Sequence, residues 1–88
     1  MFQFRYAKKF EKSVSKLPDK IKKKLPQTLL LLQEDPRHNS LFTKKNHSAS
    51  KIFKYLVYES RIDNKYRILW KYEGRKVILL LTAGDHGS

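Results

Sequence analysis

The sequence contains no cysteine. A disulfide framework, a thiolate metal site and a cysteine nucleophile are therefore excluded, and a reducing compartment suits the chain. No apolar run approaches the roughly 20 residues that a membrane-spanning helix needs. The first residues reach the charged Arg5 before any apolar stretch of signal-peptide length forms. We expect a soluble protein of the cytoplasm that has no membrane partner.

Acidic residues are also scarce. The chain has 8 Asp and Glu against 20 Lys and Arg, which gives a formal net charge of +12. Repulsion among so many like charges opposes compact folding unless a polyanion or an acidic partner relieves it. The composition therefore predicts a partner of negative charge.

What the chain does contain is sufficient for one folded domain. Hydrophobic residues make up 40% of its 88 residues, and aromatic residues make up 12%. A chain of this length forms one compact core with few layers, so we expect a single domain over residues 1–88. The hydrophobic content argues against an intrinsically disordered chain.

The N-terminal half is predicted to form a strand and two helices. Phe2, Phe4 and Tyr6 alternate with polar residues, which is typical of a half-buried strand. Apolar residues at spacings of three or four then predict a helix over residues 7–17 and a second over residues 18–35. Pro26 lies inside the second helix and predicts a kink or a short break.

The C-terminal half is predicted to be mostly strand. Residues 37–50 are polar and show no sustained period, so we expect a loop there, which Leu41 and Phe42 anchor to the core. Residues 52–62, 66–72 and 77–82 are rich in aromatic and β-branched residues and are separated by turn-like segments. The expected fold is α+β, a small two-layer sandwich in the order β-α-α-β-β-β. Its two helices cover one face of the sheet, its last three strands form an antiparallel meander, and the other face stays available.

Two arginines are expected to meet on that available face. If the hairpin turns around Asp63, Arg61 and Arg67 become neighbours, with Glu59 on the same face. Paired guanidinium groups suit a phosphodiester. The alternative is that they are solvated surface residues, one of them paired with Glu59.

Many lysines surround this part of the sequence. A lysine run on an amphipathic helix is usually its solvated side, but the lysines of the central segment add to the same field and favour a phosphate backbone over a neutral ligand. Charge alone does not identify the polyanion. The lysines expected to bind it are Lys44, Lys45, Lys51, Lys54 and Lys71.

The three histidines lack the spacing of a metal site, so no metal and no cofactor are expected. His38 and His47 are interpreted as ordinary loop residues. His86 directly follows the last predicted strand, where an imidazole near two arginines could exchange protons at neutral pH. The alternative is a C-terminal residue without a role.

Three segments together resemble a known family. ESRIDNKYRILWKYEG (residues 59–74), VILLLTAGDH (77–86) and LPDKIKKKLPQTLLLLQEDP (17–36) are similar to the RelE/ParE toxin superfamily of bacterial type II toxin-antitoxin systems. The resemblance covers nearly all of the chain, and its RelE/YoeB-like branch is the most similar.

The resemblance implies a ribosome-dependent messenger RNA endonuclease that a cognate antitoxin holds silent through an acidic, partly disordered segment. Cleavage in that branch uses the 2′-hydroxyl of the RNA and no metal. By position, Arg61 and Arg67 would stabilise the phosphate and His86 would serve as acid or base. Glu59 or Asp85 would orient His86 or replace it as the base. The five lysines named above would bind RNA.

The sequence departs from the branch in two places. A tyrosine normally follows the histidine, whereas this chain has Gly87 and Ser88, and the central segment contains no glutamate. Two other functions therefore stay open. One is a ParE-like inhibitor of DNA gyrase, which needs no acid and base pair. The other is a basic nucleic-acid-binding relative without catalysis.

Overall fold

A computed structural model describes residues 1–85 of the chain. The predicted roles of His86 and of the two residues after it lie outside the described part. The elements are β1 (Gln3–Tyr6), α1 (Lys8–Ser15), α2 (Asp19–Glu34), the 3-10 helix η1 (Asn39–Leu41), β2 (Lys44–Lys45), α3 (His47–Phe53), β3 (Tyr58–Arg61), β4 (Tyr66–Gly74) and β5 (Val77–Asp85). No helix within residues 1–85 has the length and apolar character to cross a membrane.

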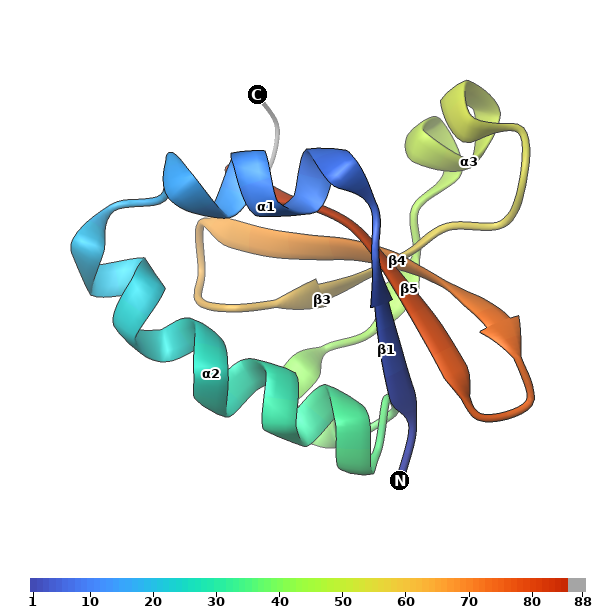
Figure 1. Cartoon of the computed structure of the whole chain (residues 1–88), viewed down its shortest axis with the longest axis horizontal. Helices are drawn as coiled ribbons and strands as arrows, with labels where there is room; N and C mark the ends of the chain where they lie inside the picture. The colour runs from blue at the N-terminus through green and yellow to red at the C-terminus, as the bar shows by residue number, and fades with distance from the viewer. Residues whose placement is uncertain (86–88) are drawn as a thin grey trace.

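One five-stranded sheet organises the fold, with the strand order β1-β5-β4-β3-β2 (Figure 1). β1 runs parallel to β5, and every other neighbouring pair is antiparallel. The predicted α+β class and the antiparallel meander of the last three strands are confirmed.

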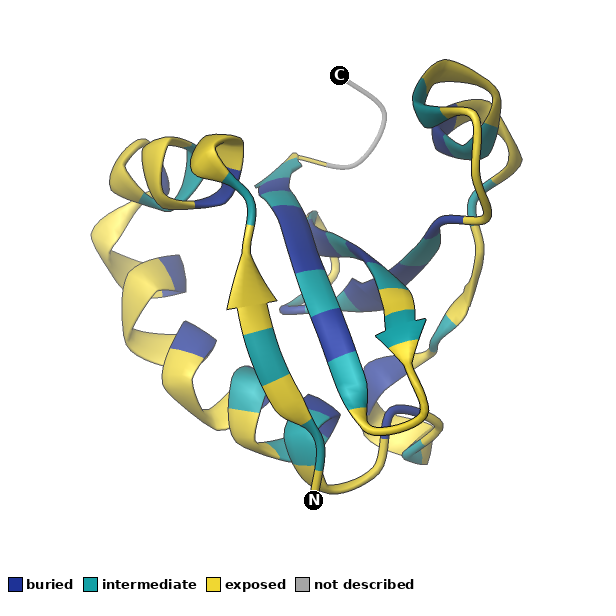
Figure 2. Ribbon diagram, turned by 45° about the vertical axis from the view of Figure 1, so that its right-hand side comes forward, coloured by how far each residue is buried: buried dark blue, intermediate teal, exposed yellow. Residues whose placement is uncertain are grey.

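Helices α1 and α2 cover one face of this sheet (Figure 1). The buried residues of α2 lie on its side toward the strands (Figure 2), at the helical spacing that the sequence showed. They pack against Ile68, Trp70, Ile78 and Leu80, all of which are fully buried. This cluster is the main core.

The opposite face is only partly available, because α3 packs on it. Ala49 and Phe53 of α3 belong to a smaller apolar cluster with Val57, Leu69 and Leu81. Leu79 and Leu81 of β5 pack in this cluster, whereas Ile78 and Leu80 belong to the main core, as alternation along a strand requires. The rest of this face carries polar residues, as the sequence predicted.

The short break that was one of the two expectations for Pro26 does not occur. α2 continues through Pro26 without a break. Proline has no amide hydrogen, so the carbonyl of Lys22 lacks its helical partner. Lys22 and Pro26 are both exposed, so water can bond this carbonyl. Buried residues on both sides of the proline, Leu25 and Leu32, hold the helix against the sheet.

The predictions for the central segment also need correction. The expected loop over residues 37–50 contains η1, β2 and the start of α3, and the strand expected from residue 52 begins only at Tyr58. The side chain of Asn46 accepts a hydrogen bond from the Ala49 amide at 2.8 Å, which caps α3. Leu41 is buried as expected, but Phe42 is 59% exposed and does not anchor the segment.

Candidate functional site

The hairpin of β3 and β4 brings the two predicted arginines together. Arg61 lies directly opposite Arg67 in the strand register, so the expected neighbourhood is confirmed. Ile62 and Ile68, which follow them in sequence, point into the core beneath the helices. Because side chains alternate along a strand, Arg61 and Arg67 project from the other face.

Arg67 is held rigidly although it carries a charge. The residue is 9% exposed. Its Nη1 donates to the carbonyl oxygens of Asp63 at 2.6 Å and Tyr66 at 3.2 Å, and its Nε lies 3.5 Å from Glu59 Oε2. Buried charges need such partners to be tolerated. The guanidinium is therefore fixed in position.

Glu59 is the buried anion of the site, at 4% exposure. While Oε2 faces Arg67, Oε1 accepts a hydrogen bond from Asn46 Nδ2 at 3.0 Å. Asn46 thus caps α3 with its side-chain oxygen and donates from its side-chain nitrogen to the carboxylate of Glu59 on β3. With both oxygens engaged, Glu59 is suited to orienting Arg67.

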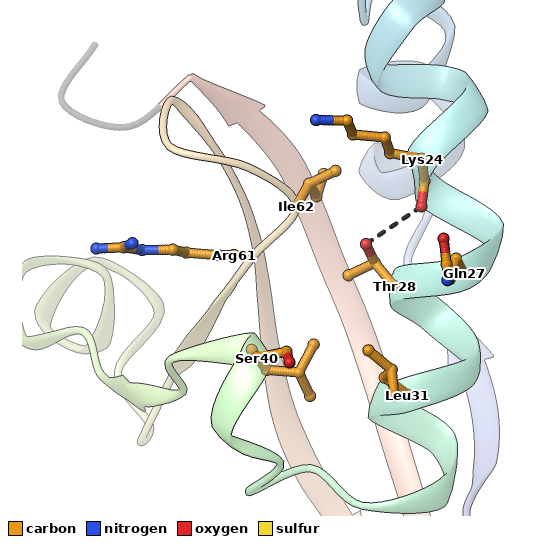
Figure 3. A pocket seen from close by; sticks show the side chains of 8 residues that line it. Lys24, Gln27, Thr28, Leu31, Ser40, Arg61 and Ile62 are labelled. Carbon is orange, nitrogen blue, oxygen red and sulfur yellow. Dashed lines mark hydrogen bonds between the residues drawn. The ribbon is translucent and has the colours of Figure 1, made fainter.

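Arg61 has a different environment. Its Cζ atom lies 4.2 Å from the centre of the Phe42 ring, a cation–π contact. Within residues 1–85 its guanidinium has no hydrogen bond and no ion pair. Figure 3 shows its side chain extending away from α2. Its donors remain available to an anion.

These groups line a pocket of about 290 Å³ on the open face. Its lining residues come from the segment before α3 and from the hairpin, and they are Phe42, Thr43, Lys44, Glu59, Arg61 and Arg67. Three cations against one buried carboxylate leave the pocket positive. Such a pocket attracts phosphate and can stabilise negative charge that develops on it.

The turn beneath Arg67 is itself fixed by a carboxylate. Asp63 Oδ1 accepts hydrogen bonds from the amides of Lys65 and Tyr66, both at 2.9 Å. Burial acts to raise the pKa of Asp63, but these two bonds and the charges of nearby lysines outweigh it. The pKa of Asp63 therefore lies below its ordinary value, and the turn is stable at neutral pH.

Only one of the five predicted RNA-binding lysines lines the pocket. Lys44 lies opposite Glu59 in the register of β2 and β3. Lys45 is opposite Tyr58, and its side chain alternates to the other face. Lys51 and Lys54 are exposed on α3 and at its end, and Lys71 Nζ lies 4.9 Å from the centre of the Tyr55 ring.

The end of β5 lies beside the arginine pair. Gly84 is opposite Arg67 and Asp85 is opposite Tyr66. A Cβ atom added at Gly84 would meet no atom of the described residues within 4 Å, so that position beside Arg67 is not crowded by residues 1–85. His86, the predicted acid or base, follows in sequence and lies outside the described residues.

Three residues of the site were missed at the sequence level, namely Phe42, Thr43 and Asn46. Thr43 shares a hydrogen bond of 2.8 Å with the buried Ser60, which binds the segment to β3. Asn46 gave a usable signal, since an asparagine three residues before an apolar helical pattern is typical of a helix N-cap. No group of three or more metal-ligating side chains occurs in the part of the chain that the structure describes.

Comparison with known proteins supports the fold. No protein-family model matches the sequence, and no curated protein matches it. Solved structures do match. RelE from the archaeal RelE-RelB complex of Pyrococcus horikoshii OT3 is 17% identical with a TM-score of 0.73, over 98% of this chain and 96% of that one.

Structures of Escherichia coli YafQ match as well. YafQ from strain BL21(DE3) is 14% identical with a TM-score of 0.74, over 98% of this chain and 94% of that one. The DinJ-YafQ complex gives 19% identity and a TM-score of 0.65 over the same shares. The chain therefore has the fold of these toxins over almost its whole length, as the resemblance implied.

Proposed function

We propose that this protein is the toxin of a type II toxin-antitoxin system and an endoribonuclease that cleaves messenger RNA on the ribosome. The observation that carries the proposal is the opposed pair Arg61 and Arg67 in a positive pocket. The similarity to RelE and YafQ over 98% of the chain supports it.

The pocket suits cleavage by the neighbouring 2′-hydroxyl of the RNA. In this reaction a base removes the hydroxyl proton while the oxygen attacks the adjacent phosphorus. The bond to the 5′-oxygen breaks, that oxygen takes a proton from an acid, and a 2′,3′-cyclic phosphate remains. Negative charge builds up on the phosphorane, where fixed cations lower the barrier. No metal is required for any of these steps.

The two arginines divide this work. Arg61, with its donors unused by residues 1–85, contacts the scissile phosphate. Arg67 is fixed by the turn and by Glu59 and supplies a preoriented positive charge beside it. Glu59 thus acts as a positioning residue. Asp85 at the end of β5, or His86, which follows it in sequence, serves as acid or base.

The expected partners follow from the same proposal. The ribosome and messenger RNA present phosphates to a chain of net charge +12, and they place the protein in the cytoplasm. The archaeal RelE structure contains RelB, and one YafQ structure contains DinJ. By analogy, a cognate antitoxin covers the basic surface of this protein with an acidic segment.

Cleavage mapping in a translating bacterial extract tests the activity. The wild-type protein is expected to cut messages only when they are translated. Arg61→Ala is expected to lower the cleavage rate about 100-fold, since it removes a donor to the phosphorane. Arg75→Ala is the matched control, because Arg75 is exposed in the β4–β5 turn outside the pocket.

The control variant should cut at the wild-type rate. Intact messages together with double-strand DNA breaks in expressing cells would favour the gyrase inhibitor instead. Normal growth with intact messages would favour a relative that binds nucleic acid without cleaving it.

A further inference from the structure

A second pocket, of about 260 Å³, lies between α2 and β3 (Figure 3). The proposed reaction does not use it. Its lining residues are Lys24, Gln27, Thr28, Leu31, Ser40, Leu41, Arg61 and Ile62.

The two pockets meet at Arg61, which lines both. Its guanidinium extends away from α2 (Figure 3), so its aliphatic part borders the second pocket while its charge belongs to the first. Leu41 of one pocket and Phe42 of the other are adjacent in sequence. β2 pairs only with Tyr58 and Glu59 in the described chain, so no strand covers the edge of β3 at Arg61.

The lining of the second pocket is apolar on one side and polar on the other. Leu41 and Ile62 are buried beneath it, and the half-buried Leu31 leaves apolar surface that a flat ring can contact. Lys24, Gln27 and Ser40 are exposed at its rim. The Thr28 hydroxyl is already used, because it donates to the Lys24 carbonyl at 3.2 Å.

The rim groups can therefore recognise a ligand. Within residues 1–85 the Gln27 amide and the Ser40 hydroxyl have no hydrogen-bond partner, since only the Ser40 backbone amide is bonded, to His38. An amide group both donates and accepts, so it can distinguish the edges of different bases. Lys24 offers a positive charge that can pair with a phosphate whatever base the nucleotide carries.

We propose that the second pocket holds the nucleotide next to the cleaved phosphate and selects its base. The base lies against Leu31, Gln27 and Ser40 read its edge, and Lys24 neutralises the following phosphate. Unstacked bases of single-stranded RNA are read in this way. The inference rests on the proposed function, because it takes the phosphate at Arg61 as the reference point.

Binding of uncleavable RNA tests the proposal without requiring catalysis. The probes are four labelled tetranucleotides with 2′-deoxyribose at the second position, which differ only in the third base. Fluorescence anisotropy at low salt is expected to show a preference of about fivefold or more for one base. Gln27→Ala should reduce this preference to within about twofold.

Lys24→Ala should weaken all four complexes to a similar degree, since a phosphate contact carries no base information. The matched controls are Lys22→Ala and Gln33→Ala on the same helix, neither of which lines the pocket, and both should bind like the wild type. Thermal melts verify that each variant is folded. Equal preference in wild type and Gln27→Ala would overturn the proposal.

The proposed nuclease activity and the proposed base-selecting pocket can be refuted independently. If Gln27→Ala still cleaves messages on the ribosome with an unchanged pattern of cut sites, the base-selecting pocket is refuted and the nuclease activity stands. If the protein cleaves no message but shows base-dependent binding that Gln27→Ala abolishes, the pocket is supported and the nuclease activity is refuted.

Discussion

Arg61 and Arg67 occupy opposed positions on neighbouring strands, yet their side chains are held in different ways. Arg67 is buried with an anionic partner and two carbonyl acceptors, whereas the Arg61 guanidinium makes a cation–π contact and has no hydrogen bond or ion pair among the described residues. A buried charge that loses its partner is costly, while an exposed one returns to water. The carboxylate of Glu59 is therefore expected to matter for stability as well as for the site.

Glu59→Gln tests this expectation. The substitution keeps the side-chain shape but leaves Arg67 with an amide in place of a carboxylate. Loss of a buried partner should lower the free energy of unfolding by about 3 kcal/mol, measured by urea denaturation at pH 7. Glu73→Gln is the matched control, because Glu73 pairs with the exposed Arg5 and its loss should cost less than about 1 kcal/mol. Equal effects of the two substitutions would contradict the role given to Glu59.

Among the elements, α3 is the helix that is bonded directly to the site and to β3. Its N-cap Asn46 also donates to Glu59, and Ser50 of the helix accepts from the Val57 amide at 2.8 Å. Only Ala49 of this helix is buried. Because so short a helix is marginal by itself, its cap and its contacts to β3 are expected to decide whether it forms.

Asn46→Ala removes both the cap and the contact to Glu59. It should lower the free energy of unfolding by about 1–2 kcal/mol, measured by urea denaturation. Asn46→Ser separates the two effects, because a serine caps a helix but is too short to replace the amide at Glu59. A serine variant as unstable as the alanine variant would show that the contact to Glu59, and not the cap, holds α3.

For the molecule as a whole, the charge is the dominant property. A net charge of +12 is carried by a chain whose radius of gyration is 11.8 Å. Only two ion pairs occur within residues 1–85, Arg5 with Glu73 and Arg67 with Glu59. Most basic side chains are thus left to repel one another and to attract phosphate.

This repulsion predicts an unusual response to salt. The free energy of unfolding should rise as NaCl increases from about 0.01 to about 0.15 M, because ions screen the repulsion within the folded state. Urea denaturation at each salt concentration measures it, since urea adds no ions. A stability that stays constant or falls over this range would show that favourable pairs outweigh the repulsion.

Local patterns in the sequence were sufficient for much of this result. Period-two alternation, helical spacing and turn residues predicted four of the five strands, the helices α1 and α2, and the α+β class. The opposition of Arg61 and Arg67 could also be predicted, because one short turn at Asp63 determines the register of the hairpin. These features depend on residues that are close together in the chain.

Only the tertiary structure decided what surrounds the arginines. Phe42 under Arg61, Asn46 at Glu59 and the second pocket beneath α2 all join residues that are far apart in sequence. Segment 37–50 has no hydrophobic period of its own, and Thr43 and Asn46 hold it through hydrogen bonds to β3. No periodic pattern encodes such contacts, since they form only once the sheet presents its edge.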